Sequence, residues 1–247
     1  MSTRVIILAA GKGKRMGSDV PKPLLPIAGR PMIEHLFDSV IDSGIDSQPI
    51  VVVASDTVEH FRQVLEDRCE YVVQDEQKGT GHAVMMAQDA AHNADNVIVL
   101  YGDHPFLSAN VLSSLVKLQQ DNSATIAILT ATLPNFDNDY VTFKNWGRIV
   151  RDENREFVAI REAKDATPEE LAITEVNPAM YAFNGEWLWA HLPLLSTKNA
   201  AGEMYLTDLI AMAVEEGQSV VSSSANPFEV VGVNTPEELA TAERLLG

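Results

Sequence analysis

The sequence offers almost nothing that would cross-link the chain or hold it in a membrane. Cys69 is the only cysteine among 247 residues, so no disulfide can form within the chain, which suits a reducing compartment. The apolar run near the N-terminus covers only residues 5–10, which is too short to span a bilayer and lacks the shape of a signal peptide. We therefore expect a cytoplasmic protein with no membrane partner.

Positive charge is also scarce, and it is unevenly placed. Lysine and arginine number 18 against 35 aspartates and glutamates, and the net charge of −17 makes nucleic acid a poor partner. Residues 1–30 nevertheless hold six basic residues and one acidic residue, whereas the remainder carries a net charge of −22. A solvated loop could collect these charges by chance, and a bound anion is the alternative explanation.

The hydrophobic pattern is typical of an α/β fold. Apolar residues make up 46% of the chain, which is enough for a sizeable core. We predict strands at 5–10, 50–54, 71–74, 97–101 and 125–132, and helices at 31–44, 57–66, 82–92 and 109–119. Strands that alternate with helices predict a Rossmann-like, mostly parallel mixed sheet flanked by helices.

The second half of the chain has shorter apolar blocks. Residues 148–152, 157–161 and 175–183 are predicted to form the strands of a small antiparallel insertion, followed by helices at 186–194 and 206–216 and a last core strand at 230–233. Thr235, Pro236 and Glu238 together indicate the capped start of a final helix. No linker interrupts the sequence, so we predict one domain over residues 1–247.

The loop after the first strand carries the clearest chemical signal. Ligands of open α/β sheets bind at the carboxyl ends of the strands, which is where this loop begins. Gly11 and Gly13 let the backbone approach a phosphate, and their N–H groups can form an anion-binding nest. Arg15 can hold two phosphate oxygens, and Lys22 supplies a mobile positive charge. The spacing matches neither common nucleotide-binding motif, because no Ser or Thr follows the lysine and a proline-rich stretch replaces an immediate helix.

This loop resembles the signature of the sugar nucleotidyltransferases. The shared pattern is Leu8-Ala-Ala-Gly-Lys-Gly-Lys-Arg-Met16, followed by Pro21-Lys-Pro23. More closely, the chain is similar to the uridylyltransferase domain of N-acetylglucosamine-1-phosphate uridylyltransferases. The further matching segments are 74–82, 101–103, 146–151, 162–166, 175–177, 199–208 and 231–234.

The resemblance implies roles for positions along the whole chain. For catalysis it implies Arg15, Lys22 and Asp103, with Mg²⁺ bound by Asp103 and Asn234. For the nucleotide it implies Leu8, Ala10, Gly11, Gly13, Gln74, Gly79 and Thr80, and for the sugar Tyr101, Gly147, Glu162, Asn177 and Tyr205. The domain would then have a nucleotide-binding part at about 1–132, a sugar-binding part at about 133–228 and a closing strand and helix at 229–247.

Several of these residues have structural alternatives. Asp103 ends a strand, where a carboxylate suits magnesium, but a turn aspartate fits the same position. The Gln74 amide both donates and accepts, which suits the edge of a base, although a polar loop would also use it. Without the resemblance, Glu162 could form a surface salt bridge and Asn234 could belong to a turn. His82 is interpreted as a structural residue.

The implied reaction joins UTP and N-acetylglucosamine-1-phosphate to give UDP-N-acetylglucosamine and pyrophosphate. Lys14 replaces the usual threonine of the family, and Pro178-Ala179 replaces a Thr/Ser-Gly pair beside a sugar contact. The nearest alternative is the same reaction of UTP or dTTP with glucose-1-phosphate. A non-catalytic, regulatory nucleotide-sugar-binding relative is the alternative of another class, and Arg15, Lys22 and Asp103 argue against it.

The resemblance also sets limits. The hexapeptide repeats of bifunctional family members do not occur in this sequence, so acetyl transfer and the trimer built by that domain are not implied. We expect a monomer or a weak homo-oligomer whose partners are its small-molecule substrates.

Overall fold

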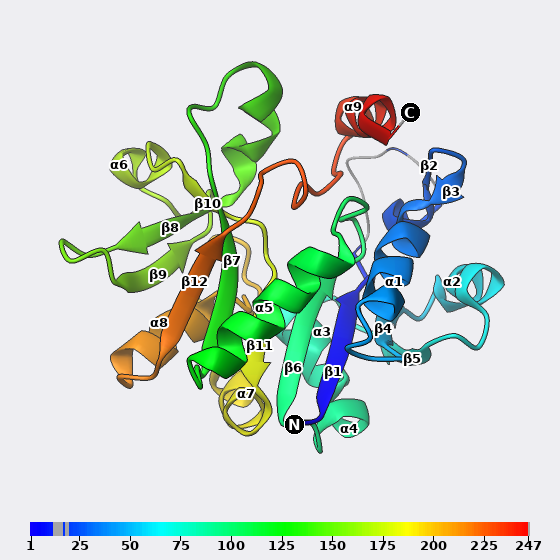
Figure 1. Cartoon of the computed structure of the whole chain (residues 1–247), viewed down its shortest axis with the longest axis horizontal. Coiled ribbons are helices and arrows are strands. Elements are labelled where there is room, and N and C mark those ends of the chain that lie inside the picture. Colours follow the sequence, from blue (N-terminus) through cyan, green and yellow to red (C-terminus); the bar gives the residue numbers. More distant parts are fainter. Residues whose placement is uncertain (12–16, 18–19, 247) are drawn as a thin grey trace.

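Strand β1 (Thr3–Leu8) lies inside a parallel group of four strands in the computed structural model, which describes residues 1–11, 17 and 20–246. It pairs on one side with β4 (Ile50–Ala54) and on the other with β6 (Asn96–Tyr101), and β5 (Glu70–Gln74) pairs with β4 at the edge. The apolar run of β1 is buried because neighbouring strands and helices on both faces cover it. These strands confirm the first part of the predicted parallel sheet (Figure 1).

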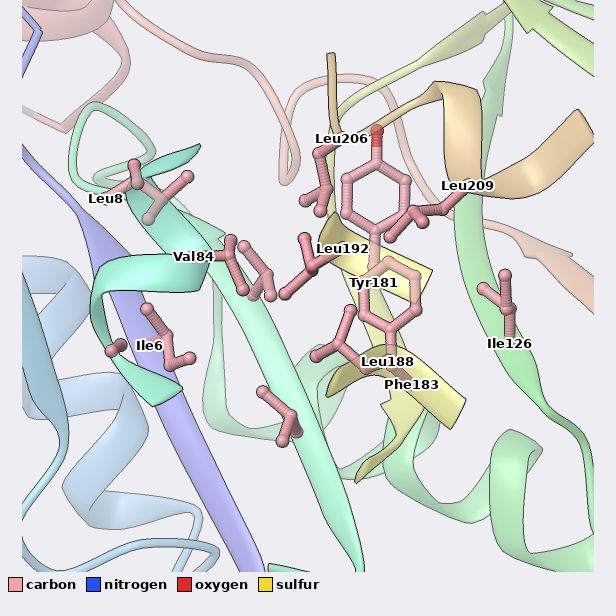
Figure 2. Close-up of a cluster of buried hydrophobic side chains, with 14 of the residues drawn as sticks. Ile6, Leu8, Val84, Ile126, Tyr181, Phe183, Leu188, Leu192, Leu206 and Leu209 are labelled. Carbon is pink, nitrogen blue, oxygen red and sulfur yellow. The ribbon is translucent and has the colours of Figure 1, made fainter. Parts of the chain in front are cut away.

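Helices cover both faces of this sheet, and alternate side chains of β1 point to opposite faces. Val5 and Ile7 join the core under α1 (Met32–Asp42), α2 (Val58–Leu65) and α5 (Ala109–Asp121). Ile6 and Leu8 join the core under α3 (Thr80–Met86), α4 (Gln88–Ala91), α7 (Gly185–His191) and α8 (Asp208–Glu215). Figure 2 shows this second core, where Val84, Leu188 and Leu209 approach the sheet from three of these helices.

The remaining strands extend the sheet in mixed directions. Strand β11 (Tyr181–Asn184) lies antiparallel between β6 and β7 (Ile126–Thr132), and β12 (Val220–Ser224) runs parallel to β7. Beyond them, β8 (Gly147–Arg151), β9 (Phe157–Arg161) and β10 (Glu175–Asn177) pair antiparallel. The mostly parallel mixed sheet and its small antiparallel insertion are therefore confirmed.

The strand predicted at 175–183 is wrong, because the chain breaks there into two strands. Pro178 has no N–H to donate, and Ala179 adopts a left-handed φ of +61° that no strand can contain. The Asn177 side chain holds this break, since its Oδ1 accepts from the Ala179 N–H at 3.0 Å. Strand β10 then pairs with β7 and β8, whereas β11 moves between β6 and β7.

The strand predicted at 230–233 is also wrong. These residues join no ladder of the sheet, and Val230 and Val233 are buried against other elements in an extended segment. The last strand is instead β12, which hydrophobicity does not reveal because Ser222 to Ser224 are polar. The capped start of α9 (Pro236–Leu246) is confirmed, since Glu238 N donates to Thr235 Oγ1 and Thr235 N donates to Glu238 Oε2.

Short elements complete the chain. The predicted helix at 82–92 is divided into α3 and α4 at Ala87, whose ψ of 4° departs from the helical value. The others are the 3-10 helices η2 (Lys22–Leu24), η3 (Asn138–Asn145) and η4 (Leu192–Leu194), the hairpin strands β2 (Pro26–Ile27) and β3 (Arg30–Pro31), and α6 (Pro168–Leu171). Within the described residues, no helix is long and apolar enough to cross a membrane.

Replacing Ala179 with glycine should stabilise the protein. The left-handed φ costs an L-residue about 1–2 kcal/mol, whereas glycine's extra freedom in the unfolded chain costs about 0.5–1 kcal/mol. We expect Ala179→Gly to raise the free energy of unfolding by about 0.5–1 kcal/mol in urea unfolding. Ala90→Gly is the matched control, because Ala90 packs against the same core from within a helix and its replacement should destabilise. Equal destabilisation by both changes would contradict this account of the break.

Candidate active site

A cleft of about 890 Å³ opens at the carboxyl ends of β1, β5 and β6. Nine of the residues predicted to bind nucleotide or sugar or to act in catalysis line it: Leu8, Ala10, Gly11, Lys22, Gln74, Gly79, Thr80, Tyr101 and Asp103. A second cavity of about 620 Å³ lies by the amino end of β6 and contains none of the predicted residues. The fold therefore brings these nine predicted residues together at one edge of the sheet.

Lys22 joins two distant parts of the chain at the mouth of this cleft. Its ammonium Nζ donates to a carboxylate oxygen of Asp103, at the end of β6, and to Asn234 Oδ1 at 2.8 Å, just before α9. Gly102 makes this possible, because a Cβ at that position would lie 3.2 Å from Pro23, the neighbour of Lys22. The partly buried cation and the buried carboxylate thus neutralise each other.

Asp103 remains ionised at this position. Burial opposes its ionisation, but the charges of Lys22 and His104 and their hydrogen bonds hold the pKa of its carboxyl well below its usual value. The His104 Nδ1 lies 3.1 Å from Asp103 Oδ1 and 3.2 Å from the Tyr101 carbonyl oxygen. Gly232 leaves room for this imidazole, since a Cβ there would lie 3.1 Å from its Nε2. Sequence reasoning missed His104, and no spacing signal distinguishes it from a turn residue.

Asp103 and Asn234 also fit a divalent metal. One carboxylate oxygen and one amide oxygen converge on a single cation, the Lys22 ammonium, so the two groups already face a common cation position. Oxygen donors are those that Mg²⁺ prefers, and it commonly takes few ligands from protein, with phosphates and water completing the shell. Among the described residues, no cluster of three or more His, Cys, Asp or Glu side chains could hold a metal unaided.

Gln74 lies at the opposite end of the cleft, where β5 ends. Its side-chain Nε2 donates to His82 Nδ1 at 2.9 Å and, at 3.4 Å, to the carbonyl oxygen of Gly79. The loop between them is fixed to the segment around Met204, because Gly81 N donates to Met204 O and Met204 N donates to Lys78 O, each at 2.8 Å. His82, which the sequence suggested to be only structural, therefore contacts a predicted nucleotide-binding side chain.

Of the predicted sugar residues, Gly147 and Asn177 are buried, whereas Tyr101, Glu162 and Tyr205 are partly exposed. Tyr101 lines the cleft itself, whereas Gly147, Glu162, Asn177 and Tyr205 are not among the residues of its wall. Glu162 Oε1 accepts from Thr207 Oγ1 at 3.1 Å, and burial raises the pKa of its carboxyl despite that bond. Burial, with Asp165 and Glu162 nearby, raises the pKa of Tyr205 to about 12, so this side chain is a neutral donor at physiological pH.

Asn177 is already engaged within the protein. It is 6% exposed, its Nδ2 donates to the Tyr181 hydroxyl at 2.6 Å, and its Oδ1 accepts from Ala179. Asn177 is also the register partner of Gly147, so the strand pairing brings these two predicted sugar residues together. Gly13, Lys14 and Arg15 lie outside the described residues, so their predicted roles remain predictions.

Comparison with known proteins places the chain among nucleotidyltransferases. Residues 5–174 match the MobA-like NTP transferase domain, and the chain belongs to that family. It is 44% identical over 242 residues to the bifunctional protein GlmU of Marinobacter nauticus, and 40% identical over 246 residues to that of Hydrogenovibrio crunogenus. These alignments cover 97% and 99% of the chain but 51% and 52% of the relatives, so it spans about half their length.

A solved structure shows the same fold. It belongs to a Bacillus anthracis protein described as a glucose-1-phosphate thymidylyltransferase, in complex with sucrose. The TM-score is 0.79 at 20% sequence identity, and the match covers 99% of this chain and 95% of the other.

The loop at Gly79 should tolerate no side chain. Its φ is +114°, and a Cβ there would lie 2.6 Å from the backbone oxygen of Met204. Gly79→Ala must therefore displace the loop that contains the Gly79 carbonyl and His82, the hydrogen-bond partners of Gln74. We expect destabilisation by about 2–4 kcal/mol in denaturant and a nucleotide affinity reduced at least tenfold. Gly217→Ala is the control, since Gly217 has a φ of +68° and open space around it. Nucleotide affinity equal in the two variants would contradict the close packing inferred at Gly79.

Proposed function

We propose that this domain transfers a uridylyl group from UTP to N-acetylglucosamine-1-phosphate and releases pyrophosphate. The observation that carries this proposal is the cleft itself, which joins the Lys22, Asp103 and Asn234 cluster at one end with Gln74 and Gly79 at the other. The first end suits phosphates because it holds the Lys22 ammonium beside two oxygen ligands. The second suits a base because it offers a fixed amide.

The nucleotide would lie along the strand ends. The uracil would contact Gln74, Gly79 and Thr80, and the phosphates would pass over Gly11 toward Lys22. Gly11 has open space where a Cβ would stand, so phosphate oxygens can approach its backbone. Leu8 and Ala10 also line the cleft, and Gly13 and Arg15 would bind the phosphates from the following loop.

Asp103 and Asn234 would hold Mg²⁺ if the metal takes the position that the Lys22 ammonium has in this structure. Bound there, the metal would neutralise negative charge on the phosphates. Lys22 would then exchange its two protein oxygens for phosphate oxygens, which its flexible stem allows. His104 would keep the Asp103 carboxylate oriented and ionised through its contact with Oδ1.

The chemistry needs no general base. The second pKa of a phosphate monoester is about 6, so the sugar phosphate already carries a nucleophilic oxyanion at neutral pH. That oxygen would attack the α-phosphorus of UTP, forming a new P–O bond while the bond to the bridging oxygen breaks and pyrophosphate leaves. Lys22 would stabilise the charge that develops, and catalysis would rest on positioning and electrostatics.

The sugar would bind beside Tyr101, next to the partly exposed side chains of Glu162 and Tyr205. Their carboxyl and hydroxyl groups can pair with hexose hydroxyls, and Gly147 lets a backbone group approach the acetamido substituent. Asn177 would support the pocket through Tyr181 and the turn at Ala179, unless the sugar displaces one of these bonds. The relatives at 38–44% identity are GlmU proteins, which does not favour the glucose-1-phosphate alternative.

The proposal includes the wider setting of the enzyme. UTP and a single buried cysteine favour the cytoplasm, and the substrates would be the partners of a monomer or weak homo-oligomer. One domain would contain the nucleotide-binding part at about 1–132, the sugar-binding part at about 133–228 and the closing segment at 229–247.

Removing the Lys22 ammonium should slow the reaction strongly. We expect Lys22→Ala to lower kcat by about 10²–10³-fold, the usual effect of losing one group that stabilises transition-state charge. Pyrophosphate release from UTP and N-acetylglucosamine-1-phosphate with Mg²⁺ present measures this rate. Lys117→Ala, on the exposed face of α5, is the control and should behave like the wild type. A Lys22→Ala enzyme with a wild-type rate would refute the role of Lys22.

A panel of substrates tests the proposed specificity. UTP, dTTP and CTP are each combined with N-acetylglucosamine-1-phosphate and with glucose-1-phosphate, and pyrophosphate release gives kcat/KM. We expect the highest value for UTP with N-acetylglucosamine-1-phosphate. A higher value for glucose-1-phosphate would show that the change at Pro178 and Ala179 has altered the sugar selected. Absence of turnover with every pair of substrates would refute the proposed nucleotidyltransferase activity.

A further inference from the structure

The amide of Gln74 has one orientation that its surroundings allow. The Gly79 carbonyl oxygen, an acceptor, lies 3.4 Å from the Gln74 amide nitrogen, and a rotated amide would place two oxygens against each other. That carbonyl cannot turn away, because the loop is fixed on both sides to the backbone of Met204. Gly79 itself has the φ of +114° that aims its carbonyl at Gln74, and no Cβ fits there.

His82 completes this arrangement. Its Nδ1 lies 2.9 Å from the same amide nitrogen, which is a donor, so Nδ1 must be an unprotonated acceptor and the ring proton must be on Nε2. Both N–H groups of the amide are then directed to acceptors of the protein. Gln74 is 3% exposed and lines the cleft, and its Oε1 makes no hydrogen bond within the described part of the chain.

We infer that His82 is a positioning residue that selects the base by holding the Gln74 oxygen toward the cleft. An outward oxygen accepts from the imide N3–H of uracil or thymine, whereas cytosine presents a lone pair at N3 and would meet repulsion. This inference rests on the proposed function and adds to it a reason for the choice of nucleotide. A buried pair of acceptors facing each other costs enough to lower affinity by about ten- to a hundredfold.

The test compares UTP with CTP in two variants of His82. His82→Ala removes the nearer of the two acceptors, at 2.9 Å, and leaves only the 3.4 Å contact with the Gly79 carbonyl to hold the amide. Rotation that presents the NH₂ group to cytosine then costs less than in the wild type. We expect the ratio of UTP to CTP affinity, measured by calorimetry, to fall at least tenfold. His82→Asn should restore most of the ratio, because the side-chain oxygen of asparagine can accept near the position of Nδ1.

His92→Ala is the matched control, since His92 is an exposed histidine whose Nδ1 contacts the nearby Asp89 carbonyl. It should leave both affinities unchanged. Thermal unfolding of each variant confirms that the fold is retained, and kcat/KM for UTP and CTP repeats the comparison during turnover.

The outcomes separate the inference from the reaction it rests on. Equal loss of UTP and CTP affinity in His82→Ala would show a merely structural histidine and would overturn the inference, as would wild-type protein that binds both nucleotides equally. A wild-type preference for UTP that His82→Ala abolishes supports the inference even if no sugar phosphate is turned over. In that case only the proposed reaction fails.

Discussion

The contact of Lys22 with Asp103 and Asn234 is the constraint around which this end of the molecule is built. It joins the segment after the first strand, the end of β6 and the start of the last helix, which are 81 and 212 residues apart from Lys22 in sequence. A partly buried ammonium without partners would destabilise the fold, and the Asp103 carboxylate and the Asn234 amide oxygen provide those partners. A small core of Ile27, Met32, Val233 and Ala242, against which Phe106 packs, also joins these three regions.

The parallel strands supply the rigid base for this contact. Strands β1, β4, β5 and β6 end at one edge, so Leu8, Gln74 and Asp103 are brought to a common cleft although no two of them are close in sequence. Both faces of β1, β4 and β6 are buried, which fixes their register and hence the positions of the residues that follow them. Binding groups placed on strand ends in this way are more precisely held than groups on long loops.

Local patterns in the sequence predicted β1 and the start of α9, because each of these features depends on residues that are close together in the chain. An apolar run bounded by glycine gave β1, and Thr235 with Glu238 gave the start of α9. The missed strand β12 and the wrongly predicted strand at 230–233 depend instead on contacts between residues that are distant in sequence. The polar strand β12 exists because β7 offers it a ladder, and the buried valines at 230 and 233 pack against other elements without pairing. His82 and His104 contact residues that are near in sequence, Gln74 and Asp103, but histidine at these spacings belongs to no motif with a known role, so the sequence alone does not reveal them.

The two ends of the cleft are prepared for their ligands in different ways. At Gln74 every donor already has an acceptor in the protein, so the base meets a fixed pattern and binding reorganises little. At Lys22 the cation is bonded to oxygens that a metal and phosphates would compete for, so binding must exchange these contacts. Recognition of the base is therefore determined by the folded protein, whereas the arrangement for phosphate transfer is completed only as the substrates bind. This division suits an enzyme that must choose its nucleotide before it assembles the charges needed for reaction.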